Sequence, residues 1–102
     1  MTKFACPICG HLTIDARYDW DICPICFWED DTLVDGDKDA TSSANGGMLV
    51  SEAQTNYILY GYSHPKHKGH VRPPQQDEPK DPNWTPLAKT RETVARAKLA
   101  GQ

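Results

Sequence analysis

The feature that most constrains this chain is a pair of identical cysteine turns. The sequence CPIC occurs at Cys6–Cys9 and again at Cys23–Cys26, with 13 residues between the two pairs. In each turn a proline presets the backbone φ angle, so that both sulfurs can face the same point. Two CxxC pairs at this spacing are typical of a metal site with four thiolates.

The identity of the metal follows from the ligand type only in part. Four thiolates suit zinc in a closed tetrahedral site, and they also suit iron. We expect structural Zn²⁺, with iron as the alternative. A redox dithiol would use one CxxC pair and leave the other without a role.

The size of the chain agrees with a metal-stabilised domain. The chain has 102 residues, of which 38% are hydrophobic and 25% charged. Domains this small bury little apolar surface, and a structural metal is one common compensation. The first residues, MTKFACPICG, contain no apolar signal segment, and no run is long enough to span a bilayer. We therefore expect a cytoplasmic protein without a membrane partner, where cysteines bind metal more often than they form disulfides.

The expected fold is small α+β and zinc-ribbon-like. Aromatic and acidic residues alternate over Tyr18–Cys23, which predicts a strand paired with His11–Asp15 in a β-hairpin. The segment Ser51–Gly61 predicts a packed helix with a Ser51–Gln54 capping box and a glycine stop. Its tyrosines are expected in the core.

The C-terminal part is expected to have two further pieces. Residues 63–86 hold six of the eight prolines and predict a linker or an extended arm. Residues 87–102 predict a basic helix, capped by Thr85, with a narrow stripe of Leu87, Val94 and Leu99. The predicted organisation is thus a CPCC-type domain at 1–62, the Pro-rich arm at 63–86 and the C-terminal helix at 87–102.

The residues around the second turn resemble a known family. The stretches CPICG, ICPICFWEDD, ANGG and LVSEAQTNY together are similar to the bacterial cysteine-rich CPCC-domain proteins, over roughly residues 4–60. Ile8 stands where that family carries an additional cysteine, which leaves Cys6, Cys9, Cys23 and Cys26 as the expected ligands. The resemblance implies a zinc-ribbon-like fold and a bound metal, and it says little about activity.

Charge suggests how the protein meets a partner. Residues 1–50 contain nine acids and three bases, whereas residues 51–102 contain five acids and eight bases. We expect a protein-interaction module whose acidic surface meets a basic protein, in the manner of an immunity-type inhibitor of a toxin. The expected partner-binding residues are Trp20, Trp28, Glu29, Asp30, Asp31, Asp35 and Asp37.

Two other functions follow less directly from the sequence. A zinc ribbon that binds nucleic acid through the basic C-terminal half is the alternative, although the cysteine half is acidic. An enzyme is not expected, because four cysteines fill the metal shell and no nucleophile–base pair is visible. His64, His67 and His70 could hold a second metal, but a solvated basic loop fits the intervening lysines better.

Overall fold

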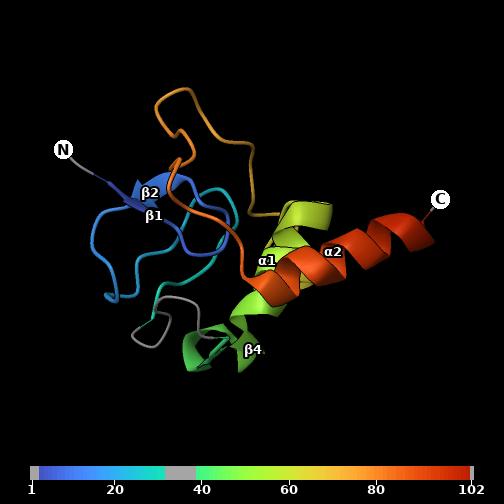
Figure 1. Ribbon diagram of the computed structural model, residues 1–102. Coiled ribbons are helices and arrows are strands. Elements are labelled where there is room, and N and C mark those ends of the chain that lie inside the picture. The colour runs from blue at the N-terminus through green and yellow to red at the C-terminus, as the bar shows by residue number, and fades with distance from the viewer. Residues whose placement is uncertain (1–2, 32–38, 102) are drawn as a thin grey trace.

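The computed structural model describes residues 3–31 and 39–101 and contains two helices and two small antiparallel hairpins (Figure 1). The elements in chain order are β1 (Phe4–Ala5), β2 (Leu12–Ile14), β3 (Thr41–Ser42), a 3₁₀ turn (Ser43–Asn45), β4 (Met48–Leu49), α1 (Val50–Tyr60), a second 3₁₀ turn (Pro65–His67) and α2 (Ala88–Ala100). The cysteine-bearing half lies on one side and the two helices on the other. The expected α+β class is confirmed at this level.

The first hairpin encloses the first CPIC turn. Strand β1 pairs with β2, with Phe4 opposite Ile14 and Ala5 opposite Leu12. The predicted pairing of His11–Asp15 with Tyr18–Cys23 is wrong, because residues 17–20 form a turn. Of the two acids in the segment Tyr18–Cys23, Asp21 holds the loop by accepting hydrogen bonds from the N–H groups of Asp15 and Ala16.

The second hairpin is tied to the residues that follow the second CPIC turn. Strands β3 and β4 pair through Thr41–Leu49 and Ser42–Met48. Between them, Asn45 donates from Nδ2 to the Glu29 carbonyl at 2.7 Å and accepts from the Glu29 N–H at 3.1 Å. One amide side chain therefore completes the backbone hydrogen bonding of Glu29 as a neighbouring strand would.

Helix α1 begins at Val50, one residue before the predicted cap Ser51, and is capped differently. Its first residue is Val50, and the N–H and hydroxyl of Ser51 both donate to the Asp39 carboxylate, at 2.9 and 2.7 Å. Asp39 thus satisfies the helix start from outside the helix, so the Ser51–Gln54 capping box is wrong. The predicted stop is confirmed, since Gly61 takes the left-handed φ of 87°.

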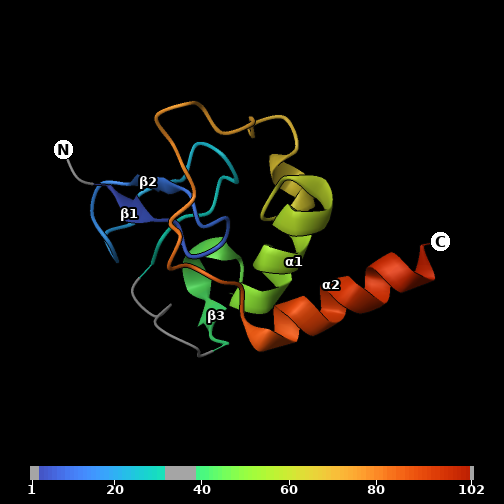
Figure 2. The ribbon, with the colours of Figure 1, turned by 45° about the horizontal axis from the view of Figure 1, so that its top comes forward.

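One face of α1 closes the core over the cysteines. Val50 and Ala53 are buried and Tyr57 packs against the same cluster. Tyr60 is 64% exposed, so the predicted core stripe ends at Tyr57. The last aromatic residue of the helix thus lies outside the core that the first part of the helix covers. Figure 2 shows α1 beside the cysteine half.

Helix α2 packs on α1 and not on the cysteine half (Figures 1 and 2). It begins at Ala88, three residues after the predicted cap, and buries Thr90 and Val94. Leu87 just ahead of the helix is also buried, whereas Leu99 is 74% exposed because it lies near the free end. Neither helix in the described part of the chain is long and apolar enough to cross a membrane.

The Pro-rich residues 63–86 run back along the cysteine half (Figure 1). The Leu12 N–H donates to the Pro79 carbonyl at 2.9 Å, and the Asp81 N–H donates to the Gly10 carbonyl at 2.8 Å. A third backbone bond joins the Ser63 N–H to the Cys26 carbonyl at 2.9 Å. The segment therefore contacts both cysteine turns.

Candidate metal centre

The four cysteines meet at one buried point. Cys6 Sγ lies 3.6 Å from Cys26 Sγ, and Cys9 Sγ lies 3.7 Å from Cys23 Sγ. All four sulfurs lie within 4.8 Å of one another, and each residue is 0% exposed. A tetrahedron with Zn–S bonds of about 2.3 Å places its sulfurs about 3.8 Å apart. The separations of 3.6 and 3.7 Å match that geometry, and the remaining pairs lie within 4.8 Å.

The two CPIC turns have the same backbone hydrogen bonds. The Cys6 carbonyl accepts from the Gly10 N–H at 2.8 Å, and the Cys23 carbonyl accepts from the Phe27 N–H at 2.9 Å. The N–H of the first cysteine of each turn also donates to the residue five positions later, His11 or Trp28, at 2.9 Å. The repeated sequence thus folds into two equivalent knuckles that face one another.

The residue after each knuckle has a left-handed backbone. Gly10 has φ of 80° and Phe27 has φ of 66°. The left-handed φ favours glycine at both positions. At Gly10 the space is also limited, because a Cβ there would lie 2.4 Å from the Trp84 ring. At the second position the Phe27 side chain lies between two imidazole rings, 4.8 Å from His67 and 5.1 Å from His70.

The surroundings of the sulfurs are almost entirely apolar. One hydroxyl reaches them, since Thr13 Oγ1 donates to Cys23 Sγ at 3.1 Å. The buried side chains that pack around the cluster are Ile8, Ile14, Ile25, Trp28, Val50 and Ala53. Water is therefore kept from the thiols, and a cation placed among them would be shielded from solvent.

The protonation of the thiols reflects this burial. Desolvation raises the pKa of Cys6 and Cys26 well above the ordinary value. Hydrogen bonds from Cys26, Cys6 and Cys9 lower the pKa of Cys23, and the Thr13 hydroxyl adds to them. Burial, followed by the charge of the nearby thiolates, raises the pKa of Tyr57 to about 12. A dication bound by all four sulfurs would instead hold every thiol deprotonated.

The donor set fits a structural metal. Four soft thiolates in a tetrahedral arrangement suit a metal ion such as zinc. They would fill all four coordination positions of the ion and leave none open for a substrate or water. The residues that would hold the ion are Cys6, Cys9, Cys23 and Cys26. Bound there, the ion would join the two knuckles and supply a charge that offsets the thiolates.

Three of the predicted partner-binding residues lie inside the domain. Trp28 and Asp30 are 0% exposed and Asp31 is 3% exposed. Their assignment to a contact surface is wrong, because these side chains are buried although polar residues dominate this stretch of the sequence. Glu29 is partly exposed and Trp20 is 53% exposed, while Asp35 and Asp37 lie outside the described residues.

The two buried acids have structural partners. Asp30 Oδ2 accepts from Arg17 Nε at 2.8 Å and from the Tyr18 N–H at 3.0 Å. Asp31 Oδ2 accepts from the Ser42 hydroxyl at 2.7 Å. A buried carboxylate needs such donors to offset its desolvation. These acids therefore hold loops against the second knuckle.

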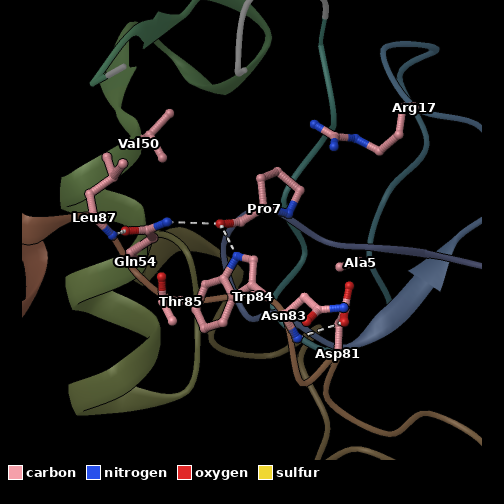
Figure 3. Close-up of a pocket in the computed structure, with 10 residues that line it drawn as sticks. All are labelled: Ala5, Pro7, Arg17, Val50, Gln54, Asp81, Asn83, Trp84, Thr85 and Leu87. Carbon is pink, nitrogen blue, oxygen red and sulfur yellow. Dashed lines mark hydrogen bonds between the residues drawn. The ribbon is translucent and has the colours of Figure 1, made fainter. Parts of the chain in front are cut away.

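The main residue that sequence reasoning missed is Gln54. Its Nε2 donates to the Pro7 carbonyl at 2.9 Å, and its Oε1 accepts from the Leu87 N–H and the Thr90 hydroxyl, at 3.0 and 2.7 Å. Trp84 Nε1 donates to the same Pro7 carbonyl at 3.2 Å. Pro7, Gln54, Trp84 and Leu87 are among the residues that line a cavity of about 330 Å³ beside the first knuckle (Figure 3). The sequence around Gln54 does not indicate this role, because the hydrogen-bond partners of its amide are 33 to 47 residues away.

The histidines have packing roles. His67 and His70 cover Phe27, and burial, with the nearby Lys66, lowers the pKa of His67. The ring of His11 lies 2.7 Å, through Nδ1, from the Glu78 carbonyl. Within the described residues, the four cysteines form the only group with metal-ligand spacing.

Comparison with known proteins agrees with this centre. The model of the family described as cysteine-rich CPCC matches residues 4–78, well over half of the chain. The match extends past residue 60, where the resemblance ended, into the arm that contacts the second knuckle. No curated protein and no solved structure matches the chain. On its family match and its paired knuckles, the chain belongs to the cysteine-rich CPCC family.

Proposed function

We propose that this protein is a non-enzymatic zinc-binding protein whose metal centre is structural. The observation that carries the proposal is the closed cluster of four fully buried sulfurs. A catalytic zinc keeps an open coordination position, whereas four protein thiolates use all of them. Burial beneath isoleucine, valine and tryptophan side chains also separates the cluster from any substrate.

We propose further that the stabilised domain acts by binding another protein. Support comes from the exposed aromatic residue Trp20 and from the acidic balance of the first half of the chain. Aromatic side chains supply much of the energy of protein interfaces, and acidic surfaces steer association with basic partners. The narrower immunity-type role has no supporting observation among the described residues, and we do not propose it.

The alternative of nucleic-acid binding has less support. Its basic residues would be those of His64–Arg72 and Lys89–Lys98. Four of these side chains have intramolecular partners: Lys89 with Asp39, Arg96 with Glu92, Arg72 with Glu78, and Arg91 with the Pro86 carbonyl. Binding to DNA or RNA that weakens steeply with added salt would favour the alternative. Binding that is absent at low salt would exclude it.

The metal proposal is tested by metal analysis and chelation of the full chain. We expect about one zinc per chain, and we expect a chelator to abolish the folded circular dichroism and tryptophan signals until zinc is restored. Cys26→Ser should lose the metal, whereas Thr13→Val, which alters only the hydroxyl beside Cys23, should retain it. A chelated chain that keeps its full fold would contradict a structural role.

A further inference from the structure

The loop between β2 and the second knuckle presents Trp20 at the surface. Trp20 is 53% exposed, and Ile22, two residues later, is 48% exposed. Large apolar side chains that stay exposed close together in a small domain are typical of interaction sites. The loop is thus a part of the cysteine half that can contact another molecule through apolar groups.

The loop is held in one conformation by two acids. The Trp20 N–H donates to the Asp30 carbonyl at 2.9 Å, and the Asp30 N–H donates to the Asp21 carbonyl at 2.9 Å. The Asp21 carboxylate accepts from the N–H groups of Asp15 and Ala16, at 2.9 and 3.2 Å. Because the backbone on both sides of Trp20 is bonded, the loop backbone would lose little freedom on binding.

The backbone of the loop is strained at its aromatic residues. Tyr18 has φ of 63° and Trp20 has φ of 60°, a region that side chains other than glycine rarely adopt. Glycine at position 20 would make the turn without strain. The stability of the fold therefore does not explain why an exposed tryptophan occupies this position. A contact between the tryptophan ring and another molecule would explain it.

Charge indicates the chemistry of the partner. Asp19 is exposed beside Trp20, and the surrounding segment also carries Asp15 and Asp21, while the nearby bases Lys3 and Arg17 are paired with Asp15 and Asp30. The basic helix α2 lies on the opposite side of the molecule from the chain that follows β2 (Figures 1 and 2). The acids of the loop are therefore not neutralised by α2.

We infer that the loop Tyr18–Ile22 is a docking site for a basic polypeptide, with the Trp20 ring as the apolar anchor and Asp19 as the exposed charge. This inference rests on the proposed binding function and names its surface and partner class. The partner would place an apolar side chain against the indole and Lys or Arg beside the carboxylate, as aromatic and charged groups combine at interfaces.

The test is a selection of random displayed peptides on the zinc-loaded full chain, followed by affinity measurement of synthetic copies. We expect the enriched peptides to carry net positive charge. Trp20→Gly should weaken their binding about tenfold or more. Asp19→Asn should weaken it less, and by an amount that shrinks with added salt. Leu99→Ala removes an apolar residue of α2 that is more exposed than Trp20, 74% against 53%, and should leave binding unchanged.

Folding and docking are separable in this design. Trp20→Gly relieves the left-handed backbone, so the variant should be at least as stable as the parent and should keep its zinc. Enriched peptides that are neutral or acidic, or that bind Trp20→Gly equally well, would overturn the docking site. So would a selection without binders, or concentration-dependent self-association that Trp20→Gly abolishes, since the occupant would then be a second copy. None of these outcomes affects the metal proposal, which metal content and chelation test independently.

Discussion

Gln54 on α1 and Pro7 in the first knuckle are joined by a hydrogen bond of 2.9 Å between the amide Nε2 and the carbonyl oxygen. The same amide accepts through Oε1 from the Leu87 N–H and the Thr90 hydroxyl. Gln54 is 3% exposed, so these bonds are not shared with water. One side chain thereby links the metal-binding turn, the first helix and the start of the second.

Gln54→Leu should lower the free energy of unfolding of the zinc-loaded protein by about 2–4 kcal/mol. The change leaves the Leu87 N–H buried without its acceptor and leaves the Thr90 hydroxyl only its longer bond to the Ser51 carbonyl at 3.4 Å, and each such loss costs about 1–3 kcal/mol. Urea denaturation followed by circular dichroism would measure the loss. Gln75→Leu, on the exposed arm, should change stability by less than about 0.5 kcal/mol. Equal stabilities of the two variants would show that the link does not matter.

Trp84 and Gly10 form a second contact between the arm and the first knuckle. Gly10→Ala should cost about 2–4 kcal/mol, because the new Cβ would both meet the Trp84 ring and strain a backbone with φ of 80°. Gly46→Ala has similar strain, with φ of 71°, but no neighbouring atoms within 4 Å, so about 1 kcal/mol is expected. Urea denaturation of both variants in parallel gives the steric cost of the Trp84 contact as the difference between their losses of unfolding free energy.

A double-mutant cycle identifies the neighbour responsible. Combining Gly10→Ala with Trp84→Ala should cost less than the sum of the single changes, by about 1 kcal/mol or more, because the ring that the new methyl meets is gone. Strict additivity would mean that Trp84 does not lie against Gly10 in solution.

The cysteine cluster could be predicted from sequence because its information is local. Each CPIC turn brings its own two sulfurs together, and a spacing of 13 residues allows the two turns to meet. The glycine stop of α1 was equally local, since Gly61 supplies a left-handed φ directly after the last helical residue. Short-range chemistry of this kind needs no knowledge of the tertiary fold.

What sequence reasoning missed depends on partners far along the chain. Gln54 is 47 residues from Pro7 and 33 from Leu87, and no pattern predicts such bonds. The strand predicted at Tyr18–Cys23 failed for a related reason. The alternation of aromatic and acidic residues looked like two faces of a strand, yet Asp21 binds the N–H groups of its own loop and Trp20 stays exposed.

Asp39 should contribute to stability in a pH-dependent way. Burial alone would raise the pKa of its carboxyl, but the hydrogen bonds from Ser51 and the nearby Lys89 outweigh it and hold the pKa below 3.8. A carboxyl whose pKa is lowered by folding stabilises the folded state at any pH above its pKa in the unfolded chain. That stabilisation is lost as the pH falls through the pKa of the carboxyl in the folded state. Asp39→Ala should therefore cost about 1 kcal/mol at pH 7, as loss of a helix cap does.

The difference in unfolding free energy between the parent and Asp39→Ala should stay constant from pH 7 to about 5 and narrow only below 3.8. Comparing the two proteins removes the effect of acid on the thiolates, which they share. Lys89→Ala tests the ion pair separately. With Lys89 62% exposed and its Nζ 3.4 Å from the Asp39 carboxylate, a change under about 0.5 kcal/mol is expected. A difference that closes above pH 5 would contradict the lowered pKa.

Phe27 occupies the position that Gly10 has in the other knuckle, and its φ of 66° separates two effects of substitution. Phe27→Ala and Phe27→Gly both remove the ring that His67 and His70 cover, but only glycine relieves the left-handed backbone. Phe27→Gly should therefore be about 1 kcal/mol more stable than Phe27→Ala in urea denaturation of the zinc-loaded protein. At the helical and buried Ala53 the order reverses, and Ala53→Gly should lose about 1 kcal/mol. If alanine were the better residue at position 27, the two knuckles would not share the left-handed turn on which their equivalence depends.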